Sequence, residues 1–564
     1  MLLASPGTPA SLADEAATDN PVDRILEMLK GDDDEAADEE DRDEDAEEAD
    51  DDESEASESD KPRSAADRIR EMREKAEAEN AKSLIAQIDF SSPISEKPMG
   101  ASLFGGAGLD LRSVLARLEQ AKNDEDCEAV LFTFYYGGMM NFAQAQEIIV
   151  AMNELKDAGK RIFVYADTYD TMSYYLASAA TDVVLMDGGE IFIPGISIEP
   201  MFYNDALNKF GIQADYVQVG EYKGAEEPYT RNSPSPELTE EMESLVNAIY
   251  GQIVDQIADG RDLRSKRVKK MIDGVMLPAA DAVKAGFVDH LADADGLRDL
   301  MAEELDNEVR LDPAYGTSDE AEFDPENPLP ALMALLNPPE VDAQDDSVAL
   351  IYAEGVITGG EGGGGLFSAP GIGSETIRRA MRMALRDDEI KAVVIRIDSP
   401  GGSALASEAM YQSIRRVAEE KPVVISIGGM AASGGYYMAV AGDKIYADPA
   451  AIVGSIGVVG GKLVWTDLYD MLGLSTASFT KGKNANLFSS TSSWDDKQRD
   501  LVRNWMTSTY EQFTDRVMST REGKIEDIDE VAKGRIFLAE QAIDLGMVDE
   551  LGGGSGERVE AAVG

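Results

Sequence analysis

The sequence predicts an α/β protein of two tandem domains that arose by internal duplication and follow a disordered acidic tail. Three observations support this prediction. Short Val- and Ile-rich strands alternate with helical segments, the same series of segments occurs twice in the 564 residues, and the first part of the chain has almost no aromatic side chains. Strands buried in a parallel sheet give such apolar runs, whereas a disordered segment lacks the apolar residues to form a core.

The predicted tail spans residues 1–82. Residues 32–60 contain 20 Asp or Glu and one Arg, and residues 62–82 have the pattern of a charged helix with few apolar anchors. We expect this region to be a solvated spacer. The first residues lack the basic and apolar parts of a signal peptide, and no apolar stretch reaches the roughly 18 residues of a membrane helix. From the sequence we therefore expect no anchor in this chain.

The formal net charge of −58 restricts the classes of partner. A chain this acidic does not bind nucleic acid or anionic lipid by charge attraction. An acidic surface of this kind suits solubility at high salt, and undiminished activity and stability at low salt would count against that hypothesis. The single cysteine, Cys127, excludes an intramolecular disulfide, and no His/Cys cluster has metal-ligand spacing. We expect neither a metal nor a cofactor.

The duplication is visible as four pairs of matching segments in the same order. Residues 129–134 match 392–397, 161–165 match 422–426, 174–177 match 436–439, and 285–291 match 545–551. The first match is followed by a pair of glycines in both copies, Gly137-Gly138 and Gly401-Gly402. A period above 200 residues indicates two homologous domains rather than a solenoid. We place the first domain at 83–305, an acidic and proline-rich linker at 306–346, and the second domain at 347–564. Apolar spacing also predicts a helix over 407–420.

Ser433 is the candidate nucleophile. It follows the apolar strand 423–427 in the run 428–435, Gly-Gly-Met-Ala-Ala-Ser-Gly-Gly, where small neighbours allow a sharp turn and the approach of a substrate backbone. The first domain has Met172 opposite Gly434, so only the second domain has the pattern of a catalytic site. A small residue that lets a helix pack on the sheet is the alternative, because Ala431 breaks the full G-x-S-x-G pattern.

The base for such a serine is predicted to be a lysine. The one histidine, His290, has Glu550 as its partner in the second domain, which favours a surface position. A lysine acts as a base when burial lowers its pKa, since desolvation disfavours the charged form. Lys223 and Lys481 occupy matching positions in the two domains, and the residue pattern alone leaves both open.

Backbone donors for an oxyanion are expected at the turn 398–403, Asp-Ser-Pro-Gly-Gly-Ser, which follows a buried strand. Glycines at the carboxyl end of a parallel strand expose N–H groups where α/β sheets bind ligands. Gly434, directly after the candidate nucleophile, is the second expected donor. On its own, the Pro-Gly-Gly run is equally typical of an ordinary turn.

Four strings, in this order along the chain, carry a resemblance to a known family. They are Val-Gly-Glu-Tyr-Lys-Gly-Ala-Glu-Glu-Pro at 219–228, the turn at 398–403, Gly-Gly-Met-Ala-Ala-Ser-Gly-Gly-Tyr at 428–436, and Gly-Ser-Ile-Gly at 454–457. Over about residues 83–555 the chain resembles the long, duplicated form of the signal peptide peptidase A (protease IV) family of Ser-Lys peptidases.

The resemblance implies two crotonase/ClpP-like domains and the following roles. Ser433 is the nucleophile, Lys223 from the first domain is the base, Ser455 orients that lysine, and Gly401 or Gly402 acts with Gly434 as the oxyanion donors. Lys481 stays the alternative base, because half-length members of the family keep their lysine at that position.

The resemblance also implies substrates, assembly and location. Substrates are remnant signal peptides and other apolar peptides, no cofactor is needed, and the assembly is a homotetramer. Family members have a membrane anchor and act on the outer side of the inner membrane. This chain has an acidic tail instead, so membrane association and a cytoplasmic location both stay open.

Two other functions compete with a peptidase. A crotonase-type acyl-CoA enzyme needs the Gly-Gly donors but has no use for Ser433, and it predicts a basic patch for the phosphates of CoA. A non-catalytic scaffold would use the acidic tail as its interaction arm. Acyl-CoA turnover that survives Ser433→Ala favours the first, and partner capture without any hydrolysis favours the second.

Overall fold

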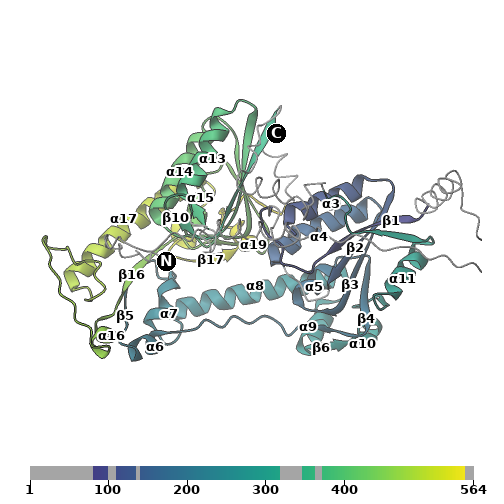
Figure 1. Cartoon of the computed structure of the whole chain (residues 1–564), viewed down its shortest axis with the longest axis horizontal. Helices are drawn as coiled ribbons and strands as arrows, with labels where there is room; N and C mark the ends of the chain where they lie inside the picture. Colours follow the sequence, from purple (N-terminus) through teal and green to yellow (C-terminus); the bar gives the residue numbers. More distant parts are fainter. Residues whose placement is uncertain (1–80, 99–108, 135–139, 318–345, 363–370, 553–564) are drawn as a thin grey trace, which may run out of the picture. The chain divides into compact units, whose positions relative to one another are not determined.

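The computed structural model describes residues 81–98, 109–134, 140–317, 346–362 and 371–552. Residues 1–80 of the predicted tail and Gly137-Gly138 lie outside these ranges. The described part contains two seven-stranded sheets and two sheets of two strands (Figure 1). Among the described residues, no helix is both long and apolar enough to cross a membrane.

The first sheet has the strand order β6-β4-β3-β2-β1-β8, with β7 beside β4. All neighbouring strands are parallel except β4 and β6. The strands are β1 (Ser83–Asp89), β2 (Cys127–Phe134), β3 (Arg161–Tyr169), β4 (Asp182–Phe192), β6 (Met276–Pro278), β7 (His290–Leu291) and β8 (Val309–Asp312). The helices of this repeat are α3 (Leu111–Asn123), α4 (Phe142–Asp157), α5 (Thr171–Ala177), α8 (Pro236–Gly260), α9 (Ser265–Asp273), α10 (Ala279–Lys284) and α11 (Gly296–Leu305).

The strand β8 differs from the sequence prediction, which placed residues 309–312 in the linker. It pairs in parallel with β1, and Val309 fills a small core cluster together with Ile85. Burial of this apolar residue holds the segment on the sheet, so the first sheet extends into the predicted linker.

The second sheet has the order β17-β15-β13-β12-β9, with β14 beside β13 and β18 beside β14. Its strands are β9 (Ser347–Glu354), β12 (Ile390–Ser399), β13 (Val423–Ala432), β14 (Lys444–Ala447), β15 (Ile452–Gly454), β17 (Ile536–Leu538) and β18 (Glu550–Leu551). The helices are α13 (Ser374–Arg386), α14 (Ala404–Ala418), α15 (Gly434–Ala439), α17 (Asp496–Arg521), α18 (Ile528–Val531) and α19 (Ala539–Ala542); a small sheet joins β10 (Ile357–Thr358) and β11 (Ile372–Gly373). The predicted helix 407–420 is α14, which begins three residues earlier.

Matching hydrogen bonds confirm the internal duplication. A buried tyrosine hydroxyl after the third main strand donates to a backbone carbonyl in both repeats, from Tyr174 to Phe287 at 2.6 Å and from Tyr436 to Met547 at 2.9 Å. An aspartate then accepts from a strand N–H at 2.8 Å in each, with the pairs Asp289 and Val183, and Asp549 and Ile445.

The two repeats share one antiparallel ribbon. It joins β5 (Gln213–Val219) of the first repeat to β16 (Val458–Val464) of the second, in a register that pairs Val219 with Val458. Short helices flank it: α6 (Asn204–Lys209), η1 (Gly224–Glu226), α7 (Glu227–Thr230) and α16 (Thr466–Met471). Because strand pairing fixes the register, the residues just after β5 lie beside those just before β16.

A buried ion-pair cluster also joins the repeats. Arg396 on β12 donates to Glu96 at 2.9 Å and to Glu147 on α4 at 2.6 Å, and all three side chains are less than a tenth exposed. Ser426 accepts from the same guanidinium at 3.0 Å. Opposite charges compensate one another here at the cost of desolvation, so removal of one partner leaves a buried charge uncompensated.

Candidate active site

Three neighbouring strands of the second sheet end at the candidate nucleophile. β13 lies between β12 and β15, with Ser399 opposite Ala431 and Ala432 opposite Gly454. All three strands run parallel, so their carboxyl ends share one edge of the sheet. Ser433 follows Ala432 at this edge, and its N–H donates to the carbonyl of Gly454 at 2.8 Å.

The backbone of Ser433 has φ 54° and ψ −118°, a conformation that glycine adopts readily and other residues rarely. The turn separates β13 from α15 and directs Ser433 to the cavity described below. Strain of this kind is held in place by its surroundings, here the bond to Gly454. The small residues around Ser433 thus allow the sharp turn that the sequence predicted.

The glycines of the turn after β12 approach Ser433 closely. A Cβ on Gly401, which has φ 95°, would lie 2.8 Å from the Cβ of Ser433. The N–H of Gly401 donates to Ser399 Oγ at 3.1 Å. Within the described ranges, no oxygen accepts a hydrogen bond from the N–H of Gly402 or of Gly434. Of the two glycines in the turn, Gly402 is therefore the one with an available donor.

Lys223 reaches the second repeat from the end of β5. Its Nζ donates to both the carbonyl oxygen and the Oγ of Ser455 at 2.8 Å each. Ser455 has φ 54° and donates its N–H to Arg535 at 2.6 Å. Lys223 also packs closely on two glycines, because a Cβ on Gly457 would lie 3.1 Å from its side-chain Cδ and one on Gly534 would overlap its backbone.

Burial changes the acid–base properties of Lys223. The residue is 6% exposed, and desolvation lowers its pKa to about 7. The carboxyl groups of Glu241 and Glu226 act in the opposite direction on Lys223, and burial raises the pKa of each of them to about 7. A fraction of the amine is thus neutral near pH 7, as a general base requires.

Lys223 and Ser433 line the same cavity, of about 280 Å³. Gly402, Gly434 and Ser455 also line it. The remaining wall is mostly apolar and includes Val356, Ala404, Tyr437, Val458, Val459 and Phe513. This arrangement combines a hydroxyl, an amine of lowered pKa and two available N–H donors beside an apolar wall. These are the groups that acyl transfer through a serine requires.

Lys481, the alternative base, lies elsewhere. It is exposed in the segment between α16 and α17, and it is not among the residues that line the cavity. Nothing in the residue pattern distinguishes it from Lys223, because burial is decided by the β5–β16 ribbon and not by the local sequence.

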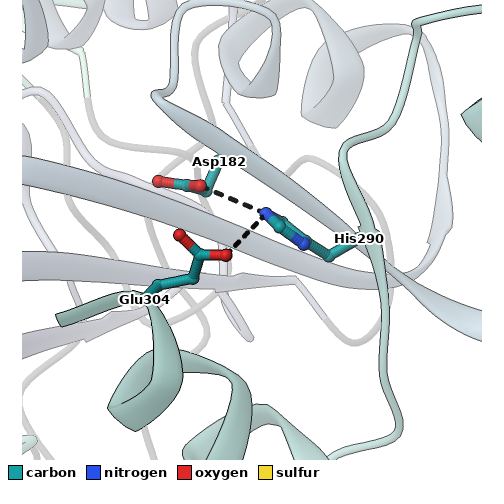
Figure 2. A group of neighbouring side chains, drawn as sticks. All are labelled: Asp182, His290 and Glu304. Carbon is teal, nitrogen blue, oxygen red and sulfur yellow. Dashed lines mark hydrogen bonds and ion pairs between the residues drawn. The ribbon is translucent and has the colours of Figure 1, made fainter. Parts of the chain in front are cut away.

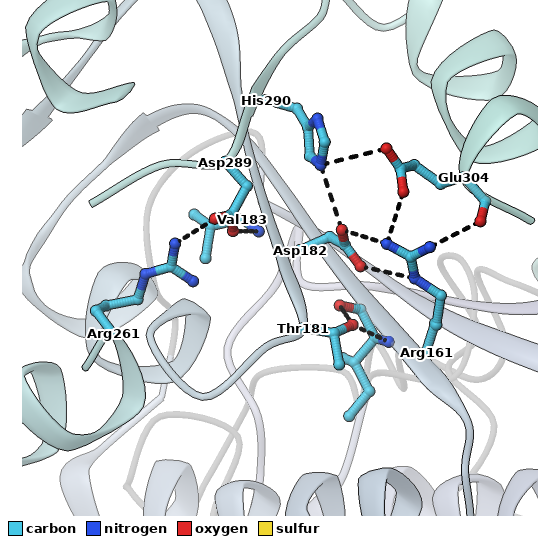
Figure 3. A network of polar contacts seen from close by, with 9 residues as sticks. Arg161, Thr181, Asp182, Val183, Arg261, Asp289, His290 and Glu304 are labelled. Carbon is cyan, nitrogen blue, oxygen red and sulfur yellow. Dashed lines mark hydrogen bonds and ion pairs between the residues drawn. The ribbon is translucent and has the colours of Figure 1, made fainter. Parts of the chain in front are cut away.

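His290 lies in the first repeat, in a polar network away from these residues. Its Nε2 lies 3.3 Å from Asp182 and 3.9 Å from Glu304. Figure 2 shows the imidazole facing both carboxylates. This is the one group in the described residues whose ligand atoms are close enough to hold a metal ion. Arg161 already donates to both carboxylates, at 2.6 Å to Asp182 and 2.9 Å to Glu304 (Figure 3). A metal ion would have to displace this guanidinium, so the group fits a structural ion pair better.

Sequence reasoning missed the polar residues that support the site. The charges of Glu226 and Glu241 act on Lys223. Ser399 Oγ accepts the hydrogen bond from the N–H of Gly401. In a chain with 109 acidic residues, a buried glutamate has no signature of its own. The available signals were two of the family strings, since Glu226 lies within 219–228 and Ser399 lies within 398–403.

Comparisons with known proteins agree with this fold. The profile of peptidase family S49 matches residues 154–308 and 415–561, and that of Clp protease matches 373–453. "Protease 4" of Haemophilus influenzae is 29% identical over 78% of this chain and 70% of its own length. "Serine protease SPPA, chloroplastic" of Arabidopsis thaliana is 28% identical over 73% and 59%, and "Putative signal peptide peptidase SppA" of Enterococcus faecium is 27% identical over 38% and 62%.

The match to the same peptidase family in both repeats defines a serine peptidase. The two S49 matches together cover more than half of the chain, one in each repeat. The chain therefore belongs to peptidase family S49, and its substrates are peptides.

Proposed function

We propose that this peptidase uses Ser433 as its nucleophile and Lys223 as its general base, in a site completed by both repeats. The observation that carries this proposal is the buried Lys223 of the first repeat, bonded to Ser455 in the cavity that Ser433 lines. Lys481 is exposed outside that cavity, so it is the weaker candidate.

The hydrogen bonds suggest how the base works. A neutral amine has two N–H groups and one lone pair. The two N–H groups donate to Ser455, which leaves the lone pair to accept the proton of Ser433 Oγ. The oxygen of Ser433 then attacks the peptide carbonyl, and the protonated Lys223 returns the proton to the leaving amine. Water, activated by the same lysine, releases the acyl group from Ser433.

The N–H groups of Gly402 and Gly434 are the proposed donors to the oxyanion. A Cβ on Gly434 would lie 3.3 Å from the nitrogen of Gly402, so the two N–H groups are close neighbours beside Ser433. Removal of one such donor in serine peptidases costs roughly 100- to 1,000-fold in kcat. Gly401 serves a different purpose, since its N–H is bonded to Ser399.

Apolar peptides, such as the remnants of signal peptides, are the proposed substrates. The apolar wall of the cavity favours apolar side chains next to the cleaved bond. The name of the Enterococcus faecium relative points to the same substrate class. By the family resemblance, we also propose a homotetramer that acts at the cell envelope.

The pH dependence of the reaction of Ser433 with a fluorophosphonate tests this mechanism. The base must be neutral, and burial lowers the pKa of Lys223 to about 7. The labelling rate should therefore rise as the pH increases through about 7 and then level off. Mass spectrometry should locate the adduct on the peptide that contains Ser433. A rate that is flat from pH 5 to pH 9, or an adduct on another serine, would contradict the proposal.

A further inference from the structure

Two buried carboxyl groups adjoin Lys223 without a part in the proposed proton transfer. Glu226 lies in η1, three residues after Lys223, and Glu241 lies in the first turns of α8. Each is 7% exposed. A carboxyl group is rarely buried unless it is paired or hydrogen-bonded, so these positions require an explanation.

Glu241 connects the two repeats at the site. Its Oε1 accepts the N–H of Ile536 at 2.9 Å, where β17 begins. Ile536 is opposite Gly454 on β15, and the carbonyl of Arg535 accepts the N–H of Ser455. One carboxyl group from the first repeat therefore holds the strand that positions Ser455, the partner of Lys223.

We propose that Glu241 is a positioning residue, which docks the lysine of the first repeat onto Ser455 of the second and places a negative charge near that lysine. This inference rests on the proposed function, because it assumes that Lys223 is the base. It adds a residue to the site that no motif of the sequence indicated.

The electrostatics of the cluster support the second half of the proposal. An ionised Glu241 or Glu226 raises the pKa of Lys223, against the larger effect of burial. Other charged groups also act on the two carboxyls: Arg535 and Glu240 on Glu241, and Glu227 and Arg231 on Glu226. Since the carboxyl groups ionise near pH 7, they compete with Lys223 for protons over the same range. Removal of either charge should make the amine neutral at lower pH.

The variant Glu241→Gln separates charge from docking. Its amide oxygen can still accept the N–H of Ile536, but the negative charge is gone. We measure kcat for peptide hydrolysis against pH and divide each variant's values by its own plateau. The acid limb, the part of the profile where kcat rises with pH, should shift to lower pH by roughly 0.5 to 1 pH unit. Glu226→Gln should move it in the same direction without any change at Ile536. Glu243→Gln, at an exposed position of the same helix α8, is the matched control and should leave the limb in place.

The variant Glu241→Ala tests docking. It removes the acceptor as well as the charge, so we expect its plateau kcat to fall at least tenfold below that of Glu241→Gln, with a smaller change in KM. Rescue by the conservative variant is the sign of a positioning role.

If the acid limb stayed at the same pH in both Glu241→Gln and Glu226→Gln, the proposed effect of charge would be overturned. If Glu241→Ala and Glu241→Gln had equal plateau kcat values, the docking role would be overturned. The proposed function fails separately, if Lys223→Ala keeps its activity. Should Glu241→Ala not fold, the comparison of Glu226→Gln with Glu243→Gln still decides the effect of charge.

Discussion

Ser433 has a backbone conformation that residues with a side chain rarely adopt, and the proposed site uses this conformation to present the nucleophile. A φ of 54° with ψ −118° directs the residue to the cavity that Lys223 also lines. Backbone strain of about 1 to 3 kcal/mol is typical where a catalytic group must be presented in one geometry. We interpret the strain at Ser433 as the energetic cost of a pre-positioned nucleophile.

This interpretation predicts a gain in stability when Ser433 is replaced by glycine. Ser433→Gly should raise the free energy of unfolding by about 1 kcal/mol, because glycine adopts this conformation without a steric penalty. The same variant should lose all hydrolytic activity. Denaturant titrations compare it with Ser433→Ala, which keeps the strain and should show no such gain. Equal stabilities of the two variants would contradict the interpretation.

At the residue scale, the residue pattern singled out one candidate nucleophile but left two candidate bases open. Ser433 and its glycines form a local pattern, since a turn after a strand depends on adjacent residues. The choice between Lys223 and Lys481 depends on which lysine is buried against another repeat, and the local pattern contains no such information. The distinction between Gly401 and Gly402 as N–H donors likewise depends on one hydrogen bond, from the N–H of Gly401 to Ser399 Oγ.

At the scale of elements, the β5–β16 ribbon determines where Lys223 lies. Its seven residue pairs fix Lys223, four residues beyond Val219, next to Ser455, three residues before Val458. Gly461 on β16 leaves no space for a side chain, because a Cβ there would lie 2.6 Å from the carbonyl oxygen of Asp215 and against the ring of Tyr216.

A matched pair of glycine substitutions tests this ribbon. Gly461→Ala forces β16 away from the backbone of β5, so we expect kcat/KM to fall about tenfold or more as Lys223 shifts. At Gly460 the added Cβ would meet only the end of the flexible Met506 side chain. Gly460→Ala should therefore stay within about threefold of the wild type. Similar losses in both variants would show that the ribbon does not position the base.

The strands of the fold were largely predictable, since buried parallel strands give continuous apolar runs. The prediction of the segments 129–134 and 392–397 is confirmed by β2 and β12. The prediction was wrong for residues 309–312, because a four-residue strand next to acidic residues has no periodic signal. The β5–β16 ribbon was also not predicted, since it pairs segments more than 230 residues apart in the sequence.

For the whole molecule, duplication divides the candidate site between two repeats. The first repeat supplies Lys223 and the second supplies Ser433 and Ser455, so the proposed mechanism requires the contact between the repeats. The buried cluster of Arg396 with Glu96 and Glu147 strengthens that contact. Its members come from segments that no local pattern relates to each other.

Replacement of Arg396 tests this contact. Arg396→Met leaves Glu96 and Glu147 buried without their cation, which should lower the free energy of unfolding by about 3 kcal/mol. Denaturant unfolding measures the loss. Arg382→Met removes an exposed partner of Glu375 on α13 and should change stability little. If both variants lost the same amount, the buried cluster would have no special part in joining the repeats.

The most direct test of the central claim is the hydrolysis of an apolar fluorogenic peptide by the wild type and three variants. We predict that Ser433→Ala and Lys223→Ala each lose at least a thousandfold in kcat, while Lys481→Ala keeps nearly full activity. This result would place one Ser-Lys site across the two repeats. Activity that survives Ser433→Ala or Lys223→Ala, or that is lost only in Lys481→Ala among the lysine variants, would contradict it.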